Sequence, residues 1–477
     1  MKRIILSSFF LLLLFAIKAE VKLPTIFSDN MLLQQNTEVS IWGWCDANKQ
    51  VTIQPSWSNK EYTVHADKSG KWNIKIETPA ASYNTYEIKI SDTKSNILLK
   101  NILIGEVWLC SGQSNMEMPM KGYKNQPVAG GNMDILKSKN KNIRLLTVKR
   151  NSQIELQDTI SGSWQEAMPE TVKEFSATAY YFGKLLNEML DVPVGLIVSS
   201  WGGSCIEAWM NKDMLQPFKG VKIPQTKDDI KEANRTPTTL YNGMIHPIAG
   251  YSIKGCIWYQ GESNYDRSDA YPLLFKTMVD SWRNIWNCGE FPFYFCQIAP
   301  YDYAFYASEN MRGGKFNSAF LREAQYKAAQ QITNCGMAVL MDIGEERCIH
   351  PQQKQTGGER LALLALAKTY GMKGFGYESP TFKEMAIENE KAILSFDNAP
   401  MWLTAFGKEL RCFEIAGADK IFHPAEAKIV RSKIEVSSSE VKEPVAVRYA
   451  FKDFITGDLF STEGLPVSSF RTDNWDE

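Results

Sequence analysis

Short runs of alternating apolar and polar residues fill the first part of the chain, from residue 20 to residue 105. Val39–Trp44, Trp72–Ile76 and Tyr86–Ile90 each repeat with a period of two, and the turn sequence Asp67–Gly70 comes directly before the second of them. A period of two is typical of a strand with one buried face. Short strands at this close spacing predict a β-sandwich-like module over residues 20–105.

The pattern changes between residues 106 and 375, where apolar runs alternate with stretches of helical period. The expected helices are Ala177–Leu190, Tyr271–Ile285, Phe320–Ile332 and Gln355–Tyr370, and the expected strands are Val107–Cys110, Val194–Val198, Ile253–Tyr259, Phe293–Ile298 and Met337–Met341. Strands that alternate with helices predict βαβ units and a mainly parallel sheet. Ligand sites in such sheets lie at the carboxyl ends of the strands.

Residues 376–477 return to short alternating segments, such as Ile393–Phe396 and Val445–Tyr449. They predict a second β module. The expected division is therefore a module at 20–105, an α/β domain at 106–375 and a module at 376–477. A chain of 477 residues agrees with two or three domains, because a single hydrophobic core stops growing near about 250–300 residues.

The first residues have the composition of an export signal. Lys2 and Arg3 precede a nearly unbroken apolar run, Ile4–Ile17, which ends in Lys18, Ala19 and Glu20. This predicts a cleaved signal peptide over residues 1–19 and a periplasmic or secreted protein. No other segment reaches about 18 apolar residues, so no membrane contact is expected after cleavage.

The overall charge argues against one class of partner. The net charge of -1, from 53 basic and 54 acidic residues, lacks the basic excess typical of nucleic-acid-binding proteins. No nucleic-acid partner is therefore expected.

Four polar segments, each directly after an expected strand, carry the candidate chemistry. In the first, Cys110–Met116, Ser114 would leave the sheet in a tight turn that contains Gly112, and Gln113 beside it is a candidate substrate contact. A serine is a weak nucleophile unless a base takes its proton, so a histidine partner is required. On its own this segment would be an ordinary polar turn.

Two further segments offer donors for a developing oxyanion. Gly202 and Gly203 lie in Ser199–Trp209, and glycines at a strand end allow backbone N–H groups to approach a reacting atom. The other segment, Trp258–Asn264, holds Gln260, whose amide could join the oxyanion site. It also holds two polar candidates for substrate contacts or for orienting the site, Glu262 and Asn264.

The fourth segment, Asp342–Pro351, supplies the candidate base. The chain has only four histidines, at positions 65, 246, 350 and 423. His350 alone follows a strand and an acid-rich loop and precedes a long helix, so it is the expected general base.

Taken together, the four segments resemble the sialate O-acetylesterase family of the SGNH hydrolase superfamily. The matching motifs are Gly112–Glu117, Trp201–Ser204, Gln260–Asn264 and Ile349–Pro351, in the same order, and the resemblance covers roughly residues 20–475. It implies a flavodoxin-like three-layer α/β/α domain with β-rich accessory modules. It also implies that Ser114 is the nucleophile, that His350 is the base and that no metal or organic cofactor is needed.

The resemblance fails at the third member of the triad. The superfamily usually places its acid in Asp-x-x-His, and sialate esterases often have Asp-Ile-His-Pro, whereas this chain has Arg347 and Cys348 at those two positions. Glu345 and Asp342 are the favoured candidates for the acid. Glu262 on another loop and a backbone carbonyl that leaves a Ser–His dyad are the alternatives.

The expected reaction is hydrolysis of an O-acetyl ester on a sugar or glycan. Acetylated sialic acid is the first substrate class, acetylated xylan a close alternative, and a non-catalytic sugar-binding relative a third. A buried cation would favour sialic acid, whose carboxylate needs a partner. Arg283 and Arg322 are candidates, although structural ion pairs are the more ordinary role for both.

Overall fold

The computed structural model describes residues 20–305 and 317–475. The predicted signal peptide, residues 1–19, lies outside the described residues. Within the described part of the chain, no helix is long and apolar enough to cross a membrane. All nine cysteines lie in this part, and each is a free thiol.

The first strands build a β module. Its strands are β1 (Leu32–Gln34), β2 (Glu38–Trp44), β3 (Gln50–Pro55), β4 (Tyr62–His65), β5 (Lys71–Glu77), β6 (Ser82–Ser91) and β7 (Asn96–Gly112). β2 and β5 form an antiparallel pair, while β6 pairs with β3 and with the first half of β7. The alternation predicted for Val39–Trp44 is present in β2, where every second residue is buried.

One long strand, β7, joins this module to the next part of the chain. Its first half pairs with β6, and its second half lies between β10 (Val194–Ser200) and β11 (Gly255–Tyr259) in parallel. The expected boundary after residue 105 therefore falls inside β7, and no linker separates the two parts there.

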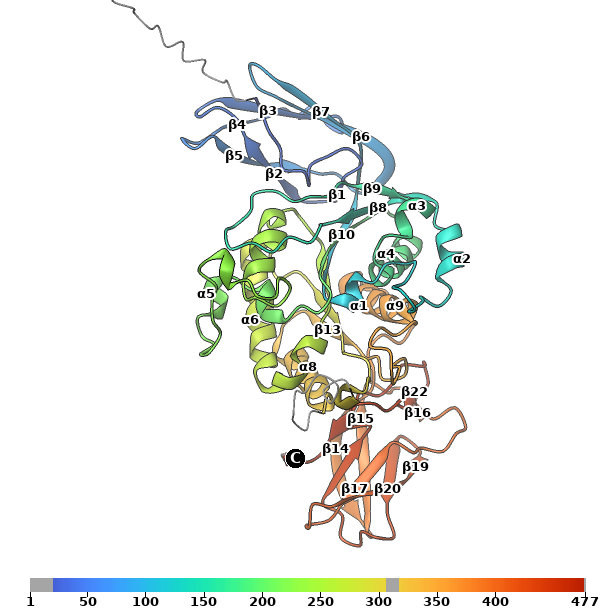
Figure 1. Cartoon of the computed structure of the whole chain (residues 1–477). Helices are drawn as coiled ribbons and strands as arrows, with labels where there is room; N and C mark the ends of the chain where they lie inside the picture. Colours follow the sequence, from blue (N-terminus) through green and yellow to red (C-terminus); the bar gives the residue numbers. More distant parts are fainter. Residues whose placement is uncertain (1–19, 306–316, 476–477) are drawn as a thin grey trace, which may run out of the picture.

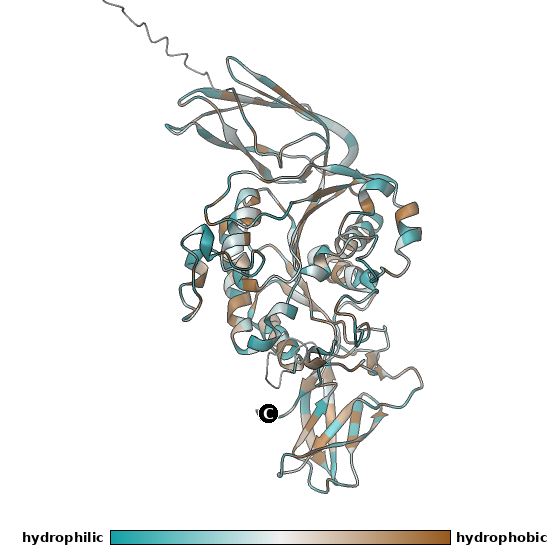
Figure 2. Ribbon diagram, in the orientation of Figure 1, coloured by the Kyte–Doolittle hydropathy of each residue, from teal (hydrophilic) through white to brown (hydrophobic). Residues whose placement is uncertain are grey.

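The main sheet is mixed, with a parallel centre. Its order is β13-β12-β11-β7-β10-β8-β9, and the strands not yet given are β8 (Asn140–Thr147), β9 (Gln165–Ala167), β12 (Phe293–Cys296) and β13 (Cys335–Ala338). Only β9 is antiparallel to its neighbour along this order. Every residue of β10 and β11 is buried, as is typical of parallel strands covered on both faces, and Figure 2 shows hydrophobic residues along these central strands.

Helices cover the main sheet. They are α1 (Ser114–Glu117), α2 (Gly131–Leu136), α3 (Pro169–Val172), α4 (Ala177–Leu190), α5 (Lys212–Leu215), α6 (Tyr271–Trp286), α8 (Ala319–Gln331) and α9 (Lys354–Leu364). In Figure 1, α6 lies on one side of the central strands, and α4 and α9 lie on the other. The prediction of α4 is confirmed at both ends, because the Ser176 side chain caps its start and Asp191 ends it at a φ of 52°.

The last strands form smaller antiparallel sheets. Their bounds are β14 (Thr381–Glu388), β15 (Lys391–Asp397), β16 (Leu403–Thr404), β17 (Phe413–Ala416), β18 (Phe422–Pro424), β19 (Glu426–Val430), β20 (Lys433–Ser437), β21 (Ala446–Tyr449), β22 (Phe460–Ser461) and β23 (Phe470–Arg471). They contact the α/β part through α8, where Arg471 makes two bonds of 3.1 Å to the carboxylate of Glu323.

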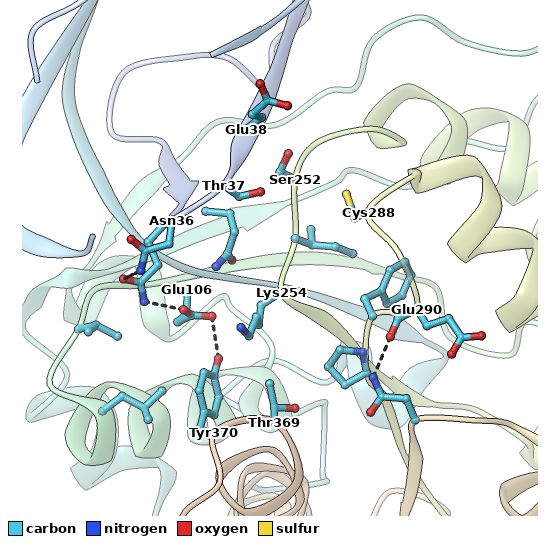
Figure 3. Close-up of a pocket in the computed structure, with 18 of the residues that line it drawn as sticks. Asn36, Thr37, Glu38, Glu106, Ser252, Lys254, Cys288, Glu290, Thr369 and Tyr370 are labelled. Carbon is cyan, nitrogen blue, oxygen red and sulfur yellow. Dashed lines mark hydrogen bonds between the residues drawn. The ribbon is translucent and has the colours of Figure 1, made fainter. Parts of the chain in front are cut away.

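A wide cavity of about 940 Å³ opens at the edge of the sheet where β7, β11 and β12 begin their parallel pairing. Figure 3 shows Glu106 there, accepting hydrogen bonds from Gln35 at 2.6 Å and from the Tyr370 hydroxyl at 2.8 Å. None of the predicted site residues lines this cavity. Since ligand sites of parallel sheets lie at the other edge, the predicted chemistry belongs at the carboxyl ends of the strands.

Candidate active site

The candidate nucleophile lies in a tight turn at the end of β7. Gly112 has a φ of +136°, and a Cβ atom there would lie 2.2 Å from the carbonyl oxygen of Tyr259, so only glycine fits. The Gln113 N–H donates to the same oxygen at 2.9 Å. Ser114 then opens the short helix α1, and its side chain is only partly buried.

A pocket of about 520 Å³ at the carboxyl ends of the strands brings the predicted segments together. The predicted residues in its wall are Gln113, Ser114, Gly202, Gly203, Glu262 and His350. They follow four different strands: β7, β10, β11 and β13. Nucleophile, glycine turn and candidate base therefore face one cavity, as the sequence predicts.

His350 is held by a residue that the sequence did not single out. Its Nδ1 atom lies 2.7 Å from Oε1 of Gln126, and the ring of Tyr123 packs edge-on against the imidazole with centroids 5.2 Å apart. Burial, together with the charge of Lys354, lowers the pKa of His350 to about 4. The imidazole is therefore neutral near pH 7, the state that a general base requires.

The two favoured acids are bound elsewhere. Both carboxylate oxygens of Asp342 accept hydrogen bonds of 2.7 Å from Arg360. Glu345 Oε1 accepts the backbone N–H of Gln352 at 2.8 Å. The bond expected from an acid to His350 Nδ1 goes to Gln126 instead, so the structure does not support the prediction that Glu345 or Asp342 orients the ring.

Gln260 and Asn264 have a different position from the one predicted. Both are fully buried and absent from the pocket wall. The Gln260 amide donates to Ser204 O at 3.1 Å and to Asn264 Oδ1 at 2.7 Å, and the same Oδ1 accepts the N–H of Ile206 at 3.0 Å. The prediction that Gln260 contacts the oxyanion is therefore wrong, and so is the prediction that Asn264 contacts the substrate. Both side chains instead form hydrogen bonds that stabilise the segment after the glycine turn.

The glycine turn lies directly against Ser114. A Cβ on Gly202 would lie 3.3 Å from the Cβ of Ser114. The Gly202 N–H already donates to Glu117 Oε2 at 2.8 Å, and this carboxylate also binds Arg150 through two bonds of 2.6 Å. Gly202 is therefore engaged with Glu117, which leaves the neighbouring Gly203 as the glycine candidate for an oxyanion donor.

The two remaining predicted contacts are fixed by hydrogen bonds. Gln113 Oε1 accepts the N–H groups of Gly261 at 3.2 Å and Ser263 at 3.3 Å, which orients its amide. Glu262 Oε1 accepts from Asn115 at 2.5 Å, and burial raises the pKa of its carboxyl group.

A buried network links the turn of Ser114 to the loop of His350. Asn115, next to Ser114, donates to Ile349 O at 3.0 Å. Lys354 Nζ donates to Asn115 Oδ1 and to Pro351 O, both at 2.7 Å. The residues on either side of His350 are thus held to the turn of Ser114. Burial lowers the pKa of Lys354 to about 8.

No metal cluster appears in the described residues, since no group of three or more His, Cys, Asp or Glu side chains in them is placed to hold an ion. The arrangement offers a hydroxyl, an imidazole and backbone N–H groups around one cavity. These are the parts needed for acyl transfer through a covalent serine intermediate.

Comparison with known proteins identifies the family. The family model described as "Carbohydrate esterase, sialic acid-specific acetylesterase" matches residues 104–362. The chain is 29% identical over 406 residues to the sialate O-acetylesterase of Homo sapiens, covering 78% of this chain and 75% of that protein. The sialate O-acetylesterase of Rattus norvegicus is 28% identical over 459 residues, covering 82% of this chain and 81% of that one.

A solved structure supports the same assignment. The crystal structure of a carbohydrate acetylesterase from Xanthomonas citri superposes with a TM-score of 0.85 at 34% identity, and the match covers 95% of this chain and 100% of that chain. The resemblance seen in the four sequence motifs is thereby confirmed. The chain is an esterase that belongs to the sialic acid-specific acetylesterase family of carbohydrate esterases.

Proposed function

We propose that this protein removes O-acetyl groups from sialic acids, with Ser114 as the nucleophile and His350 as the general base. The observation that carries the proposal is that both side chains line one pocket, where His350 Nδ1 is bound by Gln126. With its proton on Nδ1, the ring presents the lone pair of Nε2 to a proton donor.

The residues then act in a defined order. Ser114 Oγ attacks the acetyl carbonyl while His350 takes its proton, and the same proton passes to the departing sugar hydroxyl. Water attacks the acetyl-enzyme, gives its proton to His350 and releases acetate, and the proton returns to Ser114. We assign the oxyanion donors to the backbone N–H groups of Ser114 and Gly203 and to the amide of Gln113, in place of Gln260.

The finer fold assignment is also part of the proposal. Parallel strands with α6 on one side and α4 and α9 on the other support a flavodoxin-like, three-layer SGNH hydrolase domain over residues 106–375. The modules at 20–105 and 376–477 would then be accessory. Export to the periplasm or the medium rests on the sequence of residues 1–19 alone.

A cation in the pocket wall supports an anionic sugar. The guanidinium of Arg235 lies 3.7 Å from Glu232, whose side chain is 65% exposed, so this pair is weak. Asn234 donates to Gly202 O at 2.7 Å and ties the same segment to the glycine turn. We therefore assign Arg235 as the partner of the sialic acid carboxylate.

Other arginines are committed to different bonds. Arg150, also in the pocket wall, is held by both oxygens of Glu117. The two candidates from the sequence lie away from the pocket wall: Arg283 donates to Phe291 O, and Arg322 donates to Ser469. Neither is placed to bind a substrate carboxylate.

The acetylated-xylan alternative would be favoured by an open aromatic groove. The tyrosines of the pocket wall are Tyr123, Tyr265, Tyr301 and Tyr303. At most 9% of each of the last three is exposed, and the partly buried Tyr123 packs edge-on against His350. The three buried rings offer no open face on which an extended neutral chain could stack. This favours a compact sugar over a polysaccharide.

The low pKa of His350 predicts activity well into the acidic range. His350 cannot accept a proton once its ring is protonated. As pH falls, kcat/KM for p-nitrophenyl acetate should therefore stay level and then drop near pH 4. The measurement is a pH–rate profile between pH 3 and pH 8, in about half-unit steps. A fall centred near the ordinary histidine value of about 6.5 would contradict the proposed environment.

The nucleophile is tested by Ser114→Ala. Loss of the hydroxyl should lower kcat/KM for O-acetylated sialic acid by at least about 10⁴-fold, and the wild type should carry one acetyl group after a rapid quench. Ser438→Ala, in the C-terminal part, is the matched control and should keep wild-type activity. If Ser114→Ala still releases acetate at the wild-type rate, another residue is the nucleophile.

Substrate choice is tested by Arg235→Met. Because a charge-assisted bond contributes about 1.5–3 kcal/mol, KM for O-acetylated sialic acid should rise about 10- to 100-fold. Hydrolysis of p-nitrophenyl acetate should stay within about two-fold, since this ester has no carboxylate to bind. The exposed Arg411 provides a matched Arg→Met control.

If Arg235→Met lost the same activity on both esters, Arg235 would not be the residue that binds the substrate carboxylate. Acetylated xylan belongs in the same panel of substrates. Acetate release from xylan alone would overturn the sialate assignment and leave the esterase mechanism intact.

A further inference from the structure

The base of this esterase contacts an amide where serine hydrolases of this kind carry an acid. Taking the proposed roles of Ser114 and His350 as the starting point, we propose that Gln126 is the positioning residue for His350 and that the site works as Ser–His–Gln. Gln126 orients the ring through Nδ1 and contributes no negative charge.

The contact itself selects the tautomer. Oε1 of Gln126 lies 2.7 Å from His350 Nδ1. An amide oxygen can only accept, so the bond requires the proton on Nδ1 and leaves the lone pair on Nε2. This is the form that can take a proton from Ser114. The neutral amide of Gln126 therefore orients the His350 ring, as the acid of a catalytic triad would.

A small hairpin holds Gln126 in this place. Tyr123 and Gln126 exchange both backbone hydrogen bonds, at 2.9 and 3.0 Å. Asn125 lies between them with a φ of 61°, a conformation that asparagine tolerates better than most residues. The Tyr123 ring of the same hairpin packs against His350. One element thus supplies both a hydrogen bond and a packing surface to the imidazole.

The positions that carry the acid in related enzymes have other tasks here. Arg347 binds Asp302 at 3.2 Å, and the Cys348 thiol donates to the carbonyl oxygen of His350 at 3.3 Å. Asp342 and Glu345 are bound by Arg360 and by Gln352. The bond from Gln126 takes the place that an acid from this loop would have filled.

A neutral partner has a chemical consequence. A carboxylate orients the ring and also stabilises the imidazolium that forms when Ser114 loses its proton, whereas an amide does only the first. Burial and the charge of Lys354 act on His350, and Gln126 adds no negative charge to oppose them, in agreement with the lowered pKa of His350. The chain thus retains a neutral base in acidic medium, with less charge stabilisation of the imidazolium.

Gln126→Ala and Gln126→Glu separate orientation from charge. Loss of the bond in Gln126→Ala should lower kcat on the order of 10²-fold with KM within about two-fold, because ring orientation matters in the transition state. Gln126→Glu keeps the acceptor and adds a charge, so kcat should persist. The acid limb of kcat/KM should move up by about 1–3 pH units. Gln355→Ala, on the exposed side of α9, is the matched control.

The result that overturns the proposal is a Gln126→Ala enzyme with the kcat and pH profile of Gln355→Ala. An acid limb that does not move in Gln126→Glu would overturn it as well. If Gln126→Ala does not fold, as judged by circular dichroism, the pH profile of Gln126→Glu alone tests the proposal. This variant keeps the size of the side chain and its hydrogen-bond acceptor. Ser114→Ala run beside them distinguishes failure of the nucleophile assignment, since its loss of activity does not depend on Gln126.

Discussion

The proposed active site depends on one buried side chain, Asn115, which binds the turn of Ser114 to two other loops. Its amide donates to Glu262 at 2.5 Å and to Ile349 O at 3.0 Å, and its oxygen accepts from Lys354 at 2.7 Å. Buried hydrogen bonds are electrostatically stronger than exposed ones, so these three bonds hold the turn of Ser114 and both loops together. The relative position of Ser114 and His350 follows from these bonds, although the two residues come from strands on different parts of the sheet.

The same network sets the charges around His350. Lys354 is fully enclosed, and burial lowers its pKa to about 8, so it is still largely cationic near pH 7. That charge opposes protonation of His350, and the neutral Gln126 does not offset it. The arrangement therefore gives less stabilisation of the imidazolium and keeps His350, the proposed base, unprotonated in acid. Tautomer, charge and position of His350 are controlled by three different residues, each placed by its own element.

Sequence patterns predicted the main helices and strands of the α/β part, and the two residues that we propose as nucleophile and base, but they placed a domain boundary inside β7. Strand ends and the scarcity of histidine led to Ser114 and His350, which share the pocket. Gln126 was missed because it lies 224 residues from His350 in a short hairpin, and an amide carries none of the signals expected of an acid. Gln260 was misplaced because sequence gives its position after a strand but not the direction of its side chain, which is turned into the core.

The central claim is that a neutral acceptor holds His350 in the Nδ1–H form with a low pKa. Nitrogen NMR of histidine-labelled protein tests this most directly, since the chain has only four histidines and His350→Gln would assign the signal. The account predicts a proton on Nδ1 and a titration midpoint near pH 4. A proton on Nε2, or a midpoint near the ordinary value of about 6.5, would contradict it.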